Sequence, residues 1–188
     1  MSDFHTRSGV RITLTEGAPT LLDIGRALSR IPRFCGHTLQ AWNVAQHSLV
    51  VWKIIQQEMY SVSAQLYGLL HDAHESITGD IPRPFKTLDI KRLQDDLDVR
   101  IRAQQGLVGP TRFQQTIIQW ADDVALVNEA WCHCSPKIYA EIRKDIQESM
   151  TPSIQEIIAD VQYQTPTPER AADAWIQAAV HFLHRVTL

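Results

Sequence analysis

The chain has 188 residues, of which 44% are hydrophobic and 21% charged, so it can bury a substantial core and suits a single domain. Its formal net charge of −3, without a basic stripe, argues against binding of long nucleic acid. No apolar run approaches a membrane span and the N-terminus lacks an apolar signal core, so we expect no membrane association and a cytoplasmic protein.

Hydrophobic periodicity predicts helices along almost the whole chain. A short extended piece is expected at residues 11–15, and a helix at 21–30 is ended by Pro32. Asn43 and Thr111 are typical N-caps, so helices are expected to follow each of them. The predicted helices after Pro32 cover residues 44–55, 63–78, 87–105, 112–134, 136–150, 152–162 and 168–186. Strand signals are nearly absent, so the fold class is predicted to be all-α.

Two of these helices place a polar side chain on an apolar face. His47 shares its face with Val44 and Val51, and an inward histidine is more often a satisfied core residue than a ligand. Asp122 lies on the inward face of the helix after Thr111, whose predicted apolar set begins at Phe113. A core-facing aspartate is costly unless it is paired or bound to metal.

Residues 69–86 combine imidazole and carboxylate groups at close spacing. His71 is followed directly by Asp72, Glu75 lies one predicted helical turn beyond His71, and Asp80 follows the helix-ending Gly79. Histidine and carboxylate are ligands that divalent metals accept together. A His-Asp pair alone is more often a solvated surface pair, so the metal interpretation depends on the two inward side chains from other helices.

The three cysteines of the chain do not suggest a second metal motif. Their odd number argues against a disulfide framework. Cys132, His133 and Cys134 are adjacent, which is the wrong spacing for a zinc knuckle, so we interpret them as helix packing residues.

The order His47, His71-Asp72, Asp122 resembles that of the HD-domain metal-dependent phosphohydrolases. The resemblance is to the small deoxynucleotide branch, with its bacterial 5′-deoxynucleotidases and phage dATP triphosphohydrolases. It covers about residues 20–130 and includes the segments 33–34, 43–48, 70–75, 79–86 and 121–126.

The resemblance implies an HD-domain helical bundle over residues 1–188 with a central metal. It implies that the metal is bound by His47, His71, Asp72 and Asp122 and that Glu75 and Asp80 are catalytic. It further implies phosphate contacts from Arg33, Arg83 and Lys86, and base contacts from Leu22, Ile24 and Trp42. The cofactor would be one divalent ion (Zn, Co, Mn or Mg), with a second accompanying the substrate phosphates. The resemblance also implies a homo-oligomer, either a dimer or a hexamer. If the chain is encoded by a phage, its expected location is the cytoplasm of the host cell.

Three functions remain open at this stage. The segment 33–47 resembles the phage-type enzymes, so we expect a dNTP triphosphohydrolase of the dATP type, which releases deoxynucleoside and triphosphate. The alternatives are a 5′-deoxynucleotidase that hydrolyses dNMP and a non-enzymatic, metal-containing scaffold or nucleotide-binding protein. A pocket with room and cations for two further phosphates would favour the triphosphate.

Overall fold

A computed structural model of the chain describes residues 3–146 and 151–186. Within them the fold is helical, apart from a two-stranded antiparallel hairpin of β1 (Phe4–His5) and β2 (Arg11–Ile12). The predicted all-α class is therefore confirmed. The helices are α1 (Leu21–Leu28), α2 (Val44–Gln57), α3 (Val62–Leu70), α4 (Glu75–Thr78), α5 (Leu88–Gln104), α6 (Arg112–His133), α7 (Pro136–Asp145), α8 (Pro152–Gln164) and α9 (Pro168–Val186), with 3-10 turns at Arg33–Gly36 and Arg83–Phe85.

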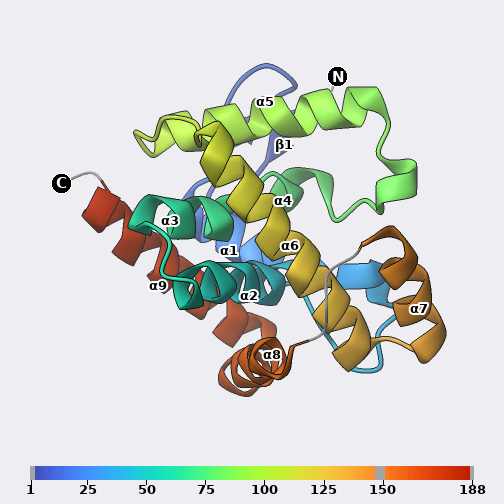
Figure 1. The fold of residues 1–188 in the computed structure, drawn as a ribbon. Helices are drawn as coiled ribbons and strands as arrows, with labels where there is room; N and C mark the ends of the chain where they lie inside the picture. The colour runs from blue at the N-terminus through green and yellow to red at the C-terminus, as the bar shows by residue number, and fades with distance from the viewer. Residues whose placement is uncertain (1–2, 147–150, 187–188) are drawn as a thin grey trace.

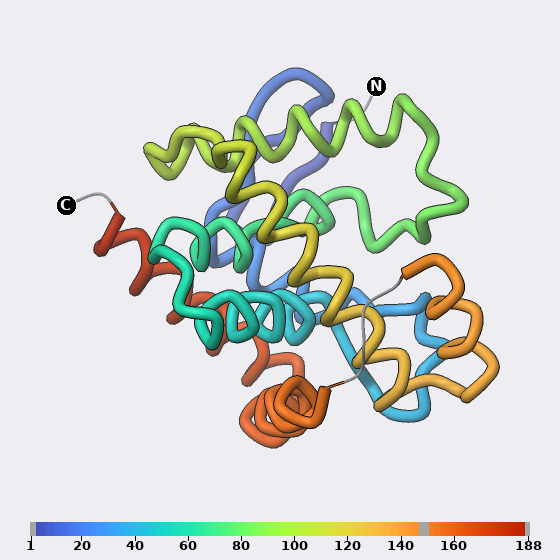
Figure 2. The backbone as a smooth tube through the Cα atoms, in the orientation of Figure 1, coloured from blue at the N-terminus to red at the C-terminus, as the bar shows by residue number. Residues whose placement is uncertain are grey.

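Helix α2 lies at the centre of the packing and contacts α3, α6, α8 and α9. Figure 1 shows α6 crossing in front of α2 and α3, with α9 behind them and α5 above. In Figure 2 the segment after α1 reaches the C-terminal end of α6, where the Leu39 N–H donates to the His133 carbonyl at 2.6 Å. Residues far apart in sequence are thus brought to one side of α6.

The sequence signals at the starts of α2 and α6 are confirmed. The side chain of Asn43 accepts from the backbone N–H of Gln46, and Gln46 returns a bond to the Asn43 backbone. Thr111 and Gln114 form the same reciprocal pair at the start of α6. Each capping box satisfies donors that a helix start would otherwise leave open, which fixes the start of the helix.

Residues 63–78 do not form the single helix that was predicted. Helix α3 ends at Leu70 and α4 begins at Glu75, and between them the Ala73 N–H donates to the Leu70 carbonyl and the Glu75 N–H to the Asp72 carbonyl. These bonds span three residues rather than four, so the segment winds more tightly than an α-helix. Consequently the side chains from His71 to Glu75 do not follow the helical faces on which the prediction relied.

The exposure of one side chain and the ends of two elements can also be compared with the sequence expectations. Phe113, predicted to face inward, is 69% exposed because it lies in the first turn of α6, beyond the core. Strand β2 stops at Ile12, short of the predicted residue 15. Helix α7 ends at Asp145, and the last part of its predicted range, residues 147–150, lies outside the described residues.

Among the described helices, none combines the length and apolar character needed to cross a membrane.

Candidate metal centre

Four predicted ligands converge from three parts of the chain. His47 comes from α2, His71 and Asp72 from the tight turn after α3, and Asp122 from α6. His47 Nε2 lies 3.1 Å from Asp122 Oδ1 and 3.6 Å from Asp72 Oδ2. His71 Nε2 lies 3.1 Å from Asp72 Oδ2 and 3.8 Å from Asp122 Oδ1, and the two Nε2 atoms are 3.3 Å apart.

These separations fit the ligand shell of a divalent ion. Four ligand atoms placed tetrahedrally at about 2.1 Å from a metal would lie about 3.4 Å from one another. The Nδ1 atoms of both histidines are engaged elsewhere, that of His47 with Glu129 Oε1 at 2.9 Å and that of His71 with the Gly68 carbonyl at 2.8 Å. Nε2 is therefore the nitrogen that each ring presents to the centre. His47, His71 and Asp122 form a group of potential ligands within 4.8 Å of one another, and Asp72 adjoins both histidines, so the residues present fit a metal bound by two nitrogens and by carboxylate oxygen.

The electrostatics of the centre favour positive charge. Burial lowers the pKa of His71, but Asp72 and Asp122 outweigh it and raise that pKa to about 9. Burial and Arg33 likewise lower the pKa of His47, yet Glu129 and Asp122 raise it to about 9. Burial raises the pKa of Asp72, and the neighbouring histidines bring it well below its usual value. In the metal-free protein, protons on the imidazoles supply the positive charge that a bound cation would supply.

Glu129 was missed by the sequence reasoning. It lies on α6, two helical turns after Asp122, and it is fully buried. One carboxylate oxygen contacts His47 Nδ1, and the other lies 3.6 Å from Arg33 Nη2. Burial raises the pKa of Glu129, but the charges of His47 and Arg33 lower it overall. Its i+7 spacing from Asp122 on an otherwise apolar helical face was the signal that could have identified it.

Arg33 is held at the edge of the centre. Its Nη1 donates to Asp80 Oδ2 at 3.3 Å, and its side chain is only 10% exposed. The two residues that follow it, Phe34 and Cys35, have left-handed backbones with φ of 54° and 52°. Non-glycine residues adopt this conformation at a cost of about 1–2 kcal/mol each, so the surrounding structure must hold the turn in place.

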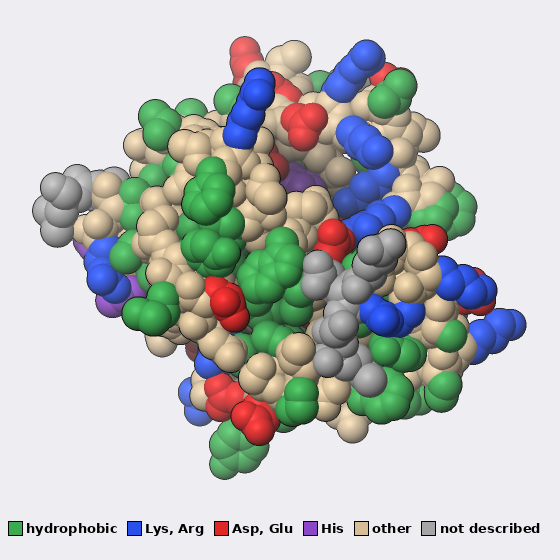
Figure 3. Space-filling view, in the orientation of Figure 1, with side chains coloured by type: hydrophobic (Ala, Val, Ile, Leu, Met, Phe, Trp, Pro, Cys, Tyr) green, Lys and Arg blue, Asp and Glu red, His purple; other side chains and the backbone are tan. Residues whose placement is uncertain are grey.

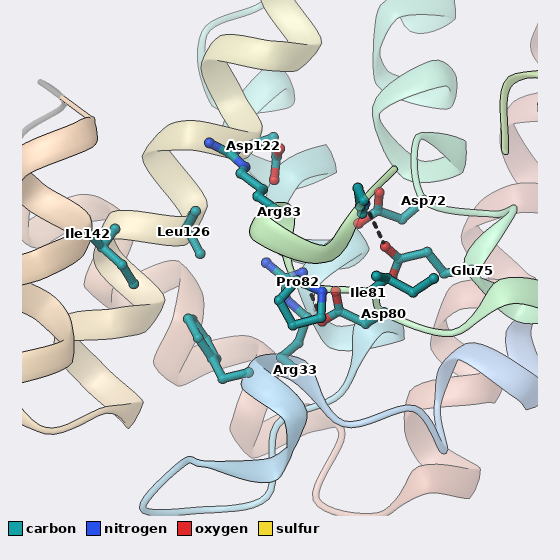
Figure 4. A pocket seen from close by; sticks show the side chains of 12 residues that line it. Arg33, Asp72, Glu75, Asp80, Ile81, Pro82, Arg83, Asp122, Leu126 and Ile142 are labelled. Atoms are coloured by element: carbon teal, nitrogen blue, oxygen red, sulfur yellow. Dashed lines mark hydrogen bonds and ion pairs between the residues drawn. The ribbon is translucent and has the colours of Figure 1, made fainter. Parts of the chain in front are cut away.

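Two clefts open beside the ligand cluster, and Asp72 and Asp122 line both. The smaller, of about 260 Å³, is also lined by Arg33, Glu75 and Asp80. In Figure 4 these three lie near one another, Arg83 extends toward Asp122, and Leu126 and Ile142 stand on the opposite side.

Glu75 is the most deeply buried carboxyl of the smaller cleft. Burial, together with the charges of Asp72 and Asp80, raises the pKa of Glu75 to about 9. The Nζ of Lys86 lies 3.5 Å from its Oε1. In the metal-free protein this environment favours the protonated form of Glu75.

The second cleft, of about 870 Å³, lies on the α5 side of the cluster. Its charged lining is mixed, with four Lys and Arg side chains (Arg83, Lys86, Lys91 and Arg102) and four aspartates (Asp72, Asp95, Asp98 and Asp122). Figure 3 shows a histidine at the floor of a hollow, with lysine and arginine side chains along one edge. Arg83 lies at the rim, 56% exposed, with its Nη2 2.8 Å from Asp123 Oδ1.

The structure does not bring the predicted base contacts to either cleft. Ile24 is fully buried in the hydrophobic core because it faces inward on α1, and Leu22, 41% exposed, lines neither cleft as the described residues form them. Trp42 is 2% exposed and stacks on His133 at 4.4 Å between ring centroids. That stacking and the burial of Cys134 agree with a packing role for residues 132–134.

Comparison with known proteins finds relatives that cover part of the chain. No family model matches it. The chain is 36% identical over 109 residues to the uncharacterized protein YfdR of Escherichia coli (strain K12), covering 57% of each chain. It is 32% identical over 110 residues to an uncharacterized protein of Rhodobacter capsulatus, covering 53% of this chain and 56% of the relative. The chain thus aligns with little more than half the length of these relatives, and the chemistry of the site must carry any assignment of function.

Proposed function

We propose that this chain is a metal-dependent phosphohydrolase of the HD-domain type that hydrolyses deoxynucleoside triphosphates, such as dATP, to deoxynucleoside and triphosphate. The observation that carries the proposal is the convergence of His47, His71, Asp72 and Asp122 at the boundary of two clefts. Structural metal sites are closed by their ligands, whereas catalytic ones keep a position open to substrate. An ion with more than four coordination positions, such as Mn or Mg, would keep positions open toward the two clefts, which favours an enzyme over a scaffold with a structural metal.

The residues around the cluster have the chemistry of a phosphoryl-transfer site. A divalent ion held there supplies a Lewis acid that lowers the pKa of water and neutralises phosphate oxygens. Arg33 uses its Nη atoms on Asp80 and Glu129, and its remaining N–H donors are available to hold a phosphate. Glu75 and Asp80 are the carboxyl groups of the smaller cleft that could orient a water and handle protons.

The size of the larger cleft supports a triphosphate over a monophosphate. Its volume of about 870 Å³ lies in the upper part of the range of ligand pockets, roughly 300–1,000 Å³. Its four basic residues lie among four aspartates, and Arg83, Lys86 and Arg102 already approach carboxylates, so the support comes from the size of the cleft and not from its net charge.

Product analysis tests the proposal. The protein is stripped with a chelator, reloaded separately with Mn, Co, Zn or Mg, and incubated with panels of dNTPs and dNMPs, after which phosphate and triphosphate are separated by anion exchange. We expect triphosphate from dNTPs, none with Asp72→Asn, and normal turnover with Asp173→Asn, a matched change at an exposed residue of α9. Phosphate released from dNMPs would identify a nucleotidase instead. Absence of hydrolysis by folded, metal-loaded protein would refute an enzymatic role.

A further inference from the structure

The smaller cleft has a charged side and an apolar side. Arg33, Glu75 and Asp80 contribute to the charged side, whereas Leu126 of α6 and Ile142 of α7 contribute to the apolar side. In Figure 4 Leu126 and Ile142 stand across the cleft from Glu75. Both side chains are only partly buried, so they leave apolar surface inside the cleft. A ligand that satisfies both sides has a phosphate or similar anion at one end and an apolar group at the other.

Helix α6 sets the spacing between the metal ligands and the apolar side. Asp122 and Leu126 are four residues apart, so they lie on the same face of the helix, about 6 Å from one another along its axis. Asp122 lines both clefts, and Leu126 lines the smaller one. A phosphate held at the metal ligands would therefore have an apolar surface one helical turn away, inside the smaller cleft.

Helix α7 holds Ile142 at the cleft although none of the residues Pro136–Asp145 is buried. The helix packs against α6, where the rings of Tyr139 and Trp131 meet edge to face at 5.2 Å between centroids. Ile146, directly after the helix, is buried. These two contacts attach α7 on either side of Ile142, so Ile142 is not needed for the attachment. Helix α7 also lies beyond the part of the chain that the family resemblance covers, so its role must come from this structure.

We propose that Leu126 and Ile142 form the surface against which the nucleobase packs, and that this surface accepts all four bases with little discrimination. The inference rests on the proposed function, because it takes the ligand to be a deoxynucleotide. The nucleoside would occupy the smaller cleft and the triphosphate the larger one, with Asp72 and Asp122, which line both, at the junction. The faces of every base are apolar, so their burial against aliphatic side chains is favourable.

The composition of the smaller cleft is the reason for the weak discrimination. Bases differ in the hydrogen-bond donors and acceptors on their edges, and amide and hydroxyl side chains can pair with either kind. Among the described residues, no Asn, Gln, Ser or Thr side chain lines this cleft. An apolar surface separates similar ligands only weakly, whereas a site built to hydrogen-bond its ligand rejects the wrong one strongly. The structure therefore supports a broader range of bases than the dATP preference that the resemblance implies.

Binding of deoxynucleosides tests the inference without hydrolysis. The Mn²⁺-loaded chain is titrated calorimetrically with deoxyadenosine, deoxyguanosine, deoxycytidine and thymidine, and with 2-deoxyribose 5-phosphate, which lacks a base. We expect the four nucleosides to bind within about 10-fold of one another, and Ile142→Ala to weaken each of them by at least about 10-fold without affecting 2-deoxyribose 5-phosphate. Ile138→Ala, which truncates the same type of side chain on the same helix but outside the cleft lining, should bind the nucleosides as the unmodified chain does.

The outcomes separate this inference from the proposed function. Unchanged nucleoside binding by Ile142→Ala, or a preference of about 100-fold or more for one base, would overturn it even if the chain hydrolyses dNTPs. No nucleoside binding by the folded, metal-loaded chain would overturn it as well, and triphosphate release from dNTPs would still support the proposed function. Nucleoside binding that depends on Ile142 in a chain without hydrolase activity would support the apolar surface and count only against the proposed function. Should Ile142→Ala fail to fold, Leu126→Ala tests the other half of the surface with the same expectation.

Discussion

Replacement of Glu129 by glutamine removes a buried charge from between a metal ligand and the proposed phosphate-binding arginine. Glu129 contacts His47 Nδ1 at 2.9 Å and lies 3.6 Å from Arg33 Nη2, with its side chain fully shielded from water. The amide can still accept from His47, so the ring should keep its place. What is lost is the negative charge that both neighbours face.

The expected effect can be estimated from this geometry. At an effective dielectric constant of about 20, opposite unit charges 3.6 Å apart attract by roughly 4–5 kcal/mol before desolvation is counted. Breaking a buried pair by removing one partner typically costs about 3–5 kcal/mol. Since Asp80 continues to pair with Arg33, we expect Glu129→Gln to lower the free energy of unfolding by about 2–3 kcal/mol. Metal affinity should fall roughly 10- to 100-fold.

Two measurements check this prediction. Urea unfolding of the metal-free protein reports the stability, and calorimetric titration of a divalent metal reports the affinity. Glu141→Gln, at an exposed residue of α7, is the matched control and should change the stability by less than about 0.5 kcal/mol. If Glu129→Gln bound metal as tightly as the unmodified chain, Glu129 would have no role in supporting His47.

Three further predictions concern the centre and the packing beneath it. Asp72→Asn should weaken metal binding at least 100-fold, as measured by titration, while circular dichroism stays unchanged; full turnover in that variant would separate activity from the metal. Because the pKa values of His47 and His71 are about 9, protons compete with the metal for these two side chains, and the metal affinity should rise from pH 6.5 to 9. Calorimetry in buffers of different ionisation enthalpy measures the protons that metal binding releases. A metal affinity that does not change with pH would contradict the assigned ligands. The same raised pKa values stabilise the metal-free fold fully below pH 6.5, and this contribution is lost as the pH rises through 9, which thermal unfolding at a series of pH values measures. Gly25→Ala would place a Cβ 2.6 Å from Ile176 Cγ1, so it should destabilise the α1–α9 contact by about 1–3 kcal/mol in urea unfolding and leave metal stoichiometry unchanged.

The sequence allowed much of the fold and the ligand cluster to be predicted because both depend on regular periodicity. A side chain that shares a helical face with apolar residues points inward, and this argument correctly placed His47 in the interior and Asp122, which is 22% exposed, beside it at the clefts. The caps at Asn43 and Thr111 are local chemistry, so they too were readable. The enzymatic roles of these residues stay predictions.

Other features depend on tertiary contacts that periodicity does not encode. No glycine or proline marks the break between α3 and α4, and residues 71–74 are compatible with a continuous helix, so the tight turn was missed. Periodicity locates the inward face of α6 but not the groups opposite it, which is why the pairing of Glu129 with Arg33 was unforeseen. Ile24, which the resemblance to the phage enzymes suggested as a base contact, lies in the hydrophobic core and lines neither cleft.

The tight turn between α3 and α4 has a consequence for how this segment can vary. Residues 71–75, which form this turn and the first position of α4, include every candidate ligand of the described residues that is not on α2 or α6. The local winding of the backbone sets the direction of each of these side chains. One added or deleted residue would rotate the following side chains about the chain axis by roughly 100–120°, so that these ligands would no longer face the metal centre. A single side-chain exchange here, such as Asp72→Asn, removes one ligand, whereas a change in loop length would displace the whole set at once.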